Sequence, residues 1–207
     1  MKAFEHHLAQ GDWEEARKTL EDSKKDLDPA VYWFKHGLVE VQQKKWSDAR
    51  ISFLKSQKIT PMEETSNNLK LVETKLSVDQ YESPRQLSDY AISTVHFIGT
   101  EIALTLNLVL LVVGLWNYKS TKSILKFSII LSLMVSLTGL SIWTKNWPWF
   151  VFEKEAPVYA GPSEIFEQVG NVPRSIKVLG TGKDSWIKVI YPSRLEGWVK
   201  KENLSEL

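Results

Sequence analysis

Two long apolar runs in the middle of the chain dominate its hydrophobic pattern. The first covers residues 98–118 and the second residues 124–143, with a short polar turn between them. A transmembrane helix needs roughly 20 predominantly apolar residues, so each run is long enough to predict one. Helices buried in a soluble core are also apolar all round, but the remaining sequence is too short and too polar to surround two of them. The pattern therefore predicts a transmembrane hairpin.

Lysine residues indicate how such a hairpin is oriented. Lys119, Lys122 and Lys126 lie in or beside the turn over 119–123, whereas Arg85 and Lys145 are isolated at the outer ends. Basic residues in short loops stay in the cytoplasm, so we expect both flanking domains to lie outside it. Residues 1–97 carry no apolar export segment, which leaves a cytoplasmic N-terminus as the alternative.

The first 80 residues show a helical pattern that recurs after 33 positions. Trp13, Ala16 and Leu20 share one helical face, where the small alanine lets a neighbouring helix approach closely. Five positions of this unit are matched in the next: Trp13 by Trp46, Ala16 by Ala49, Arg17 by Arg50, Leu20 by Phe53 and Ser23 by Ser56. Helix pairs with this period resemble tetratricopeptide repeats. The resemblance implies an all-α repeat domain over residues 1–80.

The ends of this helical region have their own features. The first repeat starts late at Met1, which suggests that Met1 is not the native start or that a signal peptide precedes it. Residues 63–79 carry an apolar stripe suited to a capping helix. Ser83 and Pro84 then form a helix-start signal, so residues 81–97 are either a linker or an interfacial helix.

The periodicity changes in the last quarter of the chain. Residues 176–179, 186–190 and 197–200 are short, rich in β-branched and aromatic residues, and separated by turn formers, which predicts strands. With Trp186 and the Gly197-Trp198 pair, they make residues 153–207 similar to bacterial SH3-type domains, small all-β barrels. Residues 144–152 are then an interfacial linker. The two tryptophans are either barrel packing or a ligand platform.

Composition and motif content argue against catalysis. The net charge is +1 without a basic stripe, which excludes nucleic acid as a partner, and the absence of cysteine excludes disulfides and thiolate chemistry. His6 and His7 are adjacent and point to different helical faces, which is poor geometry for a shared metal. No nucleophile or phosphate-loop motif is present. We expect no enzyme activity, no metal site and no cofactor.

One helix carries more apolar surface than repeat packing can bury. Over residues 31–42, Trp33 and Gly37 match the internal positions of the repeat. A second stripe consists of Val31, Phe34, Leu38 and Val41. We expect this stripe to bind a protein partner in a groove. The alternative is that the capping helix fills the groove through Leu69, Val72 and Leu76.

A second set of residues suits packing inside the hairpin. Asn107 lies on the small-residue face of the first predicted span, at the depth of Ser132 and Ser136 on the second. An amide buried in lipid is stabilised by a hydrogen bond to a polar partner. We therefore expect a contact between Asn107 and these serines.

Taken together, the segments predict a multidomain membrane protein with tetratricopeptide-like repeats, a two-helix transmembrane hairpin and a small SH3-like barrel. This order resembles the BatE family of bacterial aerotolerance operons over essentially the whole chain. The resemblance implies a multi-pass protein of the bacterial inner membrane with both terminal domains periplasmic. It also implies a non-enzymatic scaffold that works with MoxR-type ATPases and von Willebrand A-domain proteins. The alternative is peptidoglycan attachment through the SH3-like domain.

Overall fold

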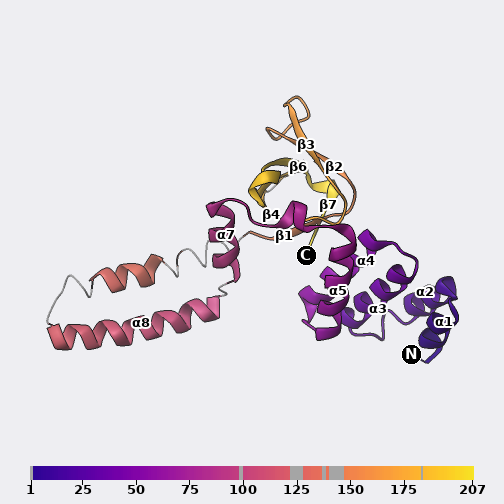
Figure 1. The fold of residues 1–207 in the computed structure, drawn as a ribbon, viewed down its shortest axis with the longest axis horizontal. Helices are drawn as coiled ribbons and strands as arrows, with labels where there is room; N and C mark the ends of the chain where they lie inside the picture. The colour runs from indigo at the N-terminus through magenta and orange to yellow at the C-terminus, as the bar shows by residue number, and fades with distance from the viewer. Residues whose placement is uncertain (1, 98–99, 122–127, 137–138, 140–146, 183) are drawn as a thin grey trace. The chain divides into compact units, whose positions relative to one another are not determined.

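The computed structural model describes residues 2–97, 100–121, 128–136, 139, 147–182 and 184–207 (Figure 1). The chain divides into two compact units. The first combines residues 1–83 with residues 149–207, and the second comprises residues 84–148. Each unit is described by itself below.

Helices make up the N-terminal part of the first unit. Their bounds are α1 Lys2–Gln10, α2 Trp13–Asp22, α3 Pro29–Gln42, α4 Trp46–Ile59, α5 Glu63–Leu76 and α6 Asp79–Glu82. The start of α3 has a clear chemical cause, because the Asp28 side chain accepts hydrogen bonds from the N–H groups of Ala30 and Val31 while Pro29 needs no partner for its nitrogen. Helices α1 and α2 pack together, and α4 packs against both α3 and α5.

The closest packing between α3 and α4 depends on a glycine. A Cβ atom at Gly37 would lie within 2.5–2.9 Å of three ring atoms of Phe53, which is fully buried. Ala49 on α4 is also fully buried. The two helices approach this closely because both carry small residues where they meet.

We predict that Gly37→Ala destabilises the protein although alanine is the better helix former. Helix propensity alone would favour alanine by about 1 kcal/mol, but the added methyl must displace the buried Phe53 ring, at a cost of about 1–3 kcal/mol. Urea unfolding measures the net change. A gain in stability would contradict the packing described for this position.

An antiparallel sheet forms the rest of the first unit. Its strands are β1 Trp149–Phe152, β2 Ala156–Tyr159, β3 Gln168–Val172, β4 Lys177–Thr181, β5 Trp186–Tyr191, β6 Gly197–Lys200 and β7 Leu204–Glu206. Two short 3-10 helices, η1 Ser193–Leu195 and η2 Lys201–Asn203, connect the last strands. The spatial order is β3-β2-β6-β5-β4-β1-β7. Strands β4, β5 and β6 coincide with the three strand segments predicted from the sequence.

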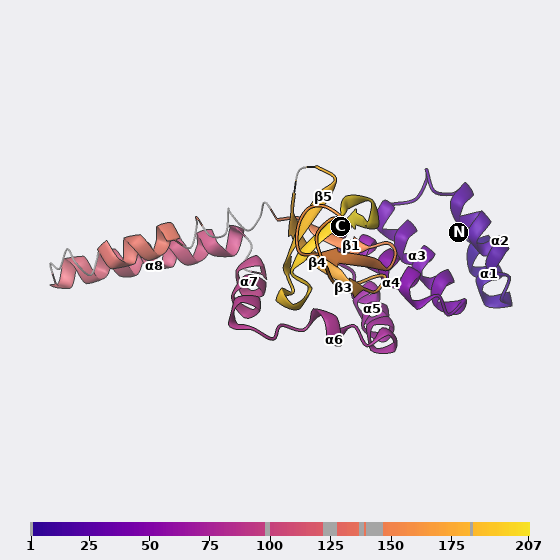
Figure 2. The same cartoon turned by 90° about the horizontal axis from the view of Figure 1, so that it is seen from above.

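Alternation along β5 places one of its faces in the core of the sheet. In β5, Ile187, Val189 and Tyr191 are buried, while the residues between them are half-exposed. The buried cluster of the sheet also includes Phe152 from β1, which belongs to the segment expected to be a linker. Val78, just before α6, packs into the same cluster. Figures 1 and 2 both show the strands of this unit next to α4 and α5.

The second unit is helical in its described residues. It contains α7 Leu87–Phe97, α8 Thr100–Thr121 and a helical segment over 128–136. Many large apolar side chains of α8 are exposed, among them Leu108, Val112 and Trp116.

In the described part of the chain, no helix has both the length and the apolar character needed to cross a membrane. The predicted transmembrane hairpin is therefore wrong, and so are the membrane fold class, the multi-pass inner-membrane location and the periplasmic placement that rested on it. Two asparagines supply a physical reason. The segment 108–116 between Asn107 and Asn117 covers about 14 Å at about 1.5 Å per residue, against about 30 Å of hydrocarbon core. Parts of both expected spans, including 98–99 and 124–127, lie outside the described residues.

Candidate interaction site

Arg50 is the most deeply buried charged residue described in the first unit, with no exposed side-chain surface. It lies on α4, and its guanidinium donates to both carboxylate oxygens of Glu82, with Nη1 to Oε1 at 2.7 Å and Nη2 to Oε2 at 2.8 Å. Nη2 also donates to Oε1 of Glu73 on α5 at 2.8 Å. A further bond goes to the carbonyl oxygen of Ser175, in the loop between β3 and β4. One side chain therefore joins α4, α5, α6 and the sheet.

Glu82 extends this network into the sheet. Its Oε1 atom accepts a hydrogen bond from the backbone N–H of Lys177 at 2.6 Å, and its carbonyl oxygen accepts one from the Tyr191 hydroxyl at 3.0 Å. Burial disfavours the charged guanidinium, but Glu82 and then Glu73 outweigh burial, so the pKa of Arg50 lies above its ordinary value. Burial, reinforced by the charge of Arg50, lowers the pKa of Lys177 despite the two carboxylates.

Further ion pairs surround this buried network where the helices meet the sheet. Arg174 pairs with Asp48 of α4, and Lys55 of α4 pairs with Glu153 at 2.9 Å. Val151 of β1 is fully buried among the apolar residues of α4 and α5. These contacts fix the helices to the sheet. Because Arg50 is enclosed and bonded on all sides, we assign it a structural role and not a ligand-binding one.

We predict that Arg50→Met lowers the free energy of unfolding by about 3–5 kcal/mol, because it leaves Glu73 and Glu82 without their counter-ion at a buried interface. Arg17→Met is the matched control. Arg17 occupies the same position one repeat earlier, but only a 3.4 Å hydrogen bond to Gln43 is formed there, so its replacement should cost about 1 kcal/mol or less. If urea unfolding shows that Arg50→Met and Arg17→Met lower the free energy of unfolding equally, the structural role assigned to Arg50 is wrong.

A second prediction concerns pH. Burial would raise the pKa of Glu153, but the Lys55 ammonium outweighs burial and holds it below the ordinary 4.5. The stability contributed by this pair is therefore present above about pH 4.5 and is lost as the pH falls through the lower folded-state pKa. Urea midpoints of the native chain and Glu153→Gln should differ at pH 7 and converge toward pH 3. If the difference between the two urea midpoints is the same at pH 7 and pH 3, the pair of Lys55 and Glu153 does not titrate as described.

The apolar stripe expected to bind a partner lies on α3, and all four of its residues are half-buried. Phe34, Leu38 and Val41 pack against the cluster that contains Leu69 and Val72 of α5. The structure therefore brings together the two stripes whose contact was the alternative to a partner groove. Val31 is not among the residues that pack against this cluster.

The polar residues expected to meet inside the hairpin lie in the second unit. Asn107 on α8 is 7% exposed, whereas Ser132 and Ser136 are both exposed. The burial in lipid from which their contact was argued is lost with the predicted membrane hairpin, and the contact itself stays a prediction from the sequence.

The closest approach to a catalytic arrangement in the described residues joins three side chains of α3 and α4. The Nδ1 atom of His36 lies 3.2 Å from both Ser52 Oγ and Glu40 Oε1, and Ser52 donates to Glu40 Oε2 at 2.7 Å. A serine triad needs the carboxylate and the hydroxyl on opposite ring nitrogens. Here the same nitrogen faces both, and the hydroxyl is buried. The geometry suits helix packing rather than nucleophilic attack. Glu40 is buried where α3 and α4 pack together.

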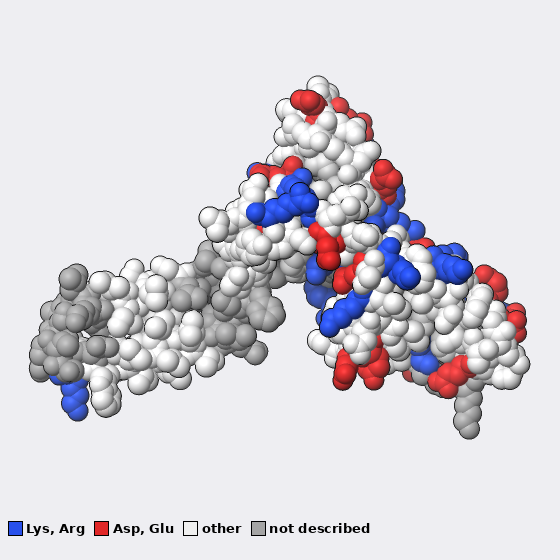
Figure 3. Space-filling view, viewed as in Figure 1, with Lys and Arg blue, Asp and Glu red and all other residues white. Residues whose placement is uncertain are grey.

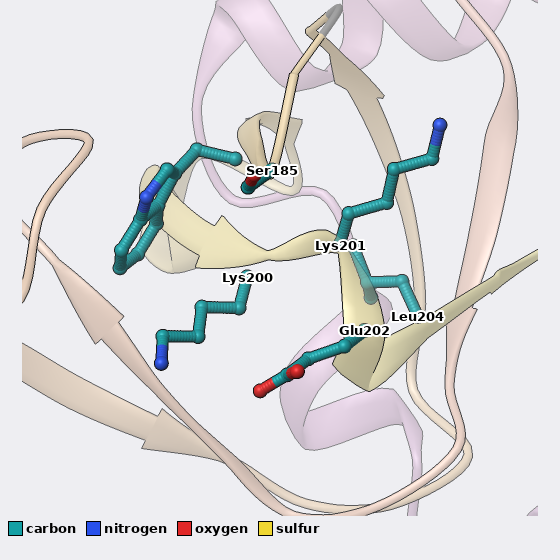
Figure 4. A pocket seen from close by; sticks show the side chains of 6 residues that line it. Ser185, Lys200, Lys201, Glu202 and Leu204 are labelled. Carbon is teal, nitrogen blue, oxygen red and sulfur yellow. The ribbon is translucent and has the colours of Figure 1, made fainter.

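A pocket of about 540 Å³ lies where β5, β6 and η2 meet (Figure 4). Its lining includes Trp186, Lys200 and Glu202. Lys200 also forms a 2.6 Å ion pair with Glu164, which raises the pKa of this lysine. In Figure 4 the Glu202 carboxylate points to the same side as the Lys200 ammonium, whereas Lys201 points away. The pocket offers an aromatic ring beside charged groups.

The loop between β2 and β3 presents apolar side chains to solvent. Ile165 is 95% exposed and Phe166 is 50% exposed. The loop is held by its own hydrogen bonds: Ala160 N–H donates to Glu167 O at 2.9 Å, and Phe166 N–H donates to Ser163 O at 3.2 Å. Gly161 lets the Phe166 ring lie against the loop, because a Cβ there would come within 2.8 Å of the ring.

This loop was missed from the sequence. Ile165 and Phe166 stand between Glu164 and Glu167, a pattern too short to distinguish an exposed loop from a buried strand end. In the space-filling view the surface of this hairpin is mostly uncharged, with acidic side chains beside it (Figure 3).

Comparisons with protein-family models, curated proteins and solved structures gave no match. They therefore give no support to the tetratricopeptide and SH3 assignments, and the resemblance to the BatE family stays a prediction from the sequence.

Proposed function

We propose that this protein is a non-enzymatic scaffold that holds a protein partner through the β2–β3 loop. The exposure of Ile165, at 95%, is the observation that carries the proposal. A single exposed apolar residue is ordinary on a protein surface. This one stands beside a second, Phe166, on a loop that is already fixed by backbone hydrogen bonds.

A fixed loop is well suited to binding because little conformational entropy is lost when the partner docks. Apolar anchors that enter a partner's pocket contribute most of the affinity of a typical interface. The neighbouring Glu167 adds negative charge at the rim, whereas Glu164 is already paired with Lys200. The partner that fits this loop therefore has an apolar pocket with basic residues around it.

The ion pairs between the helices and the sheet support a scaffold function. They fix α4 and α5 to β1 and β4. The β2–β3 loop is therefore carried by a unit in which the helices and the sheet are joined. The non-enzymatic part of the proposal is supported by the geometry of His36, Glu40 and Ser52. MoxR-type ATPases and von Willebrand A-domain proteins, which the family resemblance implies, are the first partners to test.

A photo-crosslinking amino acid placed at position 165 tests the proposal in the full chain. We expect it to capture a specific protein, whereas the same probe at Leu71, an apolar residue of α5 that is 49% exposed, should not. Ile165→Ser should then weaken binding of that protein at least tenfold while the melting temperature stays unchanged, because the side chain is almost fully exposed. Leu71→Ser is the matched control. Absence of specific capture at 165 would contradict the proposal.

The pocket beside Trp186 favours a second candidate, attachment to peptidoglycan. Sugar rings stack on aromatic side chains, and Trp186 lines this pocket. Co-sedimentation of the full chain with purified sacculi tests this candidate. Binding that is lost in Trp186→Ala and retained in Ile165→Ser would favour it over the scaffold.

A further inference from the structure

The chain crosses between its two units twice. It leaves the first unit after Ser83 and returns to it at Trp149. Residues 84–148 are therefore inserted into the first unit, whose two halves, residues 1–83 and 149–207, form one compact body. An insertion of this kind begins and ends at points that the surrounding unit fixes.

Both crossings are held by the same two residues of the sheet. Tyr191 of β5 donates its hydroxyl to the carbonyl oxygen of Glu82 at 3.0 Å, and its ring meets the Trp149 ring edge to face, with centroids 6.0 Å apart. Lys177 of β4 donates its backbone N–H to Oε1 of Glu82 at 2.6 Å, and its ammonium lies 4.5 Å from the centroid of the Trp149 ring. The exit and the return of the chain are thus tied to one place.

The exit is also connected to the buried ionic network. Arg194 donates to the carbonyl oxygens of Tyr81 and Asp79, the second at 3.1 Å, and so fixes the turn that leads to the exit. Glu82, one residue before Ser83, binds Arg50 through both of its carboxylate oxygens. A displacement of the exit therefore acts directly on the ion pair that joins α4 to α6.

The second unit leads its chain out and back. Figures 1 and 2 both show the helical segment 128–136 running alongside α8. Asn107 and Gly114, two turns apart on α8, are buried, while the residues directly before and after each of them are exposed. One face of α8 is thus packed within the second unit.

We propose that the two units are coupled through the two crossings, so that order in the second unit tightens the joint between helices and sheet in the first. Closing a flexible loop has an entropic cost that rises with loop length. When the second unit is ordered, its residues no longer form a flexible loop, and the first unit closes around it at a lower entropic cost. Thermodynamic coupling is reciprocal, so a looser joint in the first unit also destabilises the second.

This coupling goes beyond the proposed scaffold function. It acts through Lys177 and Tyr191, and neither belongs to the β2–β3 loop. A molecule that orders the second unit would strengthen the contact between Glu82 and Arg50 without touching either residue. The fold thus contains a route by which an event in residues 84–148 regulates the first unit.

Amide hydrogen exchange of Lys177 in the full-length chain reports on the joint, because this N–H is bonded to Glu82. Gly114→Asp places a charge at a buried position of α8 and should loosen the second unit. We expect the Lys177 amide to exchange at least threefold faster in this variant. Leu115→Asp is the matched control, because Leu115 is 52% exposed, and it should leave this exchange unchanged. Faster exchange in α8 with no change at Lys177 would overturn the proposal.

The opposite direction is tested by a milder change in the sheet. Tyr191→Phe removes the hydroxyl that donates to Glu82 and should speed amide exchange in α8 at least twofold. Tyr159→Phe, which removes a hydroxyl from β2, is the control and should not. A purely structural role for Tyr191 would change exchange in the first unit alone, so unchanged exchange in α8 would also overturn the proposal.

A flexible linker tests whether the crossings carry the effect. Gly-Ser residues inserted between Ser83 and Pro84 free the exit from the start of the second unit, so both effects on exchange should disappear. Effects that persist with the linker would show that the crossings do not couple the units. None of these variants alters Ile165, so the result is separate from the test of partner binding.

Discussion

Arg50 belongs to a helix, yet its hydrogen-bond partners come from three other places: Glu73 on α5, Glu82 on α6 and the backbone of Ser175 before β4. Placing a guanidinium out of contact with water is costly unless every donor finds an acceptor. Here the acceptors are two carboxylates and a carbonyl, from parts of the chain up to 125 residues away. The geometry of the first unit is therefore constrained by the need to complete this one network. If α5, α6 or the β3–β4 loop moved away, a buried charge would lose its partner.

This constraint links folding to the proposed functions. The helices alone do not carry the exposed loop, and the sheet alone does not complete its own core, because Val78 packs among the sheet residues and Val151 packs among the helix residues. The contacts made by Arg50, Lys55 and Arg174 join the two. They fix the helices to β1 and to the loop before β4, and they leave the β2–β3 loop exposed.

Local structure could be predicted from the sequence where the hydrophobic period was regular. The strand residues of β5 are visible in the sequence itself. The small residue at Gly37 was recognised as an internal packing position, and the close contact with Phe53 agrees with that. The strand β1, Trp149–Phe152, was missed because residues 144–152 were interpreted as an interfacial linker next to the predicted membrane hairpin. The membrane hairpin was predicted from the length of the two apolar runs alone, although Asn107 and Asn117 interrupt the first of them.

The site was harder to predict because it depends on contacts between distant segments. Arg50 was noted only as a repeat position equivalent to Arg17, and no local signal distinguishes the buried arginine from the other. The difference lies in Glu73 and Glu82, which follow 23 and 32 residues later and come together only in the folded chain. The β2–β3 loop was missed for a different reason. Apolar residues between glutamates are as compatible with burial as with exposure, so the local sequence does not distinguish the two.

The central claim is that the helices and the sheet of the first unit form one cooperative structure joined through Arg50. Native-state amide hydrogen exchange tests it most directly, by comparing the opening free energy of α4 with that of β4 and β5. The account predicts that the slowest amides of all three elements open with the same free energy, and that Arg50→Met separates them. If α4 and the strands already open with clearly different free energies in the native chain, the helices and the sheet are independent, and the claim is wrong.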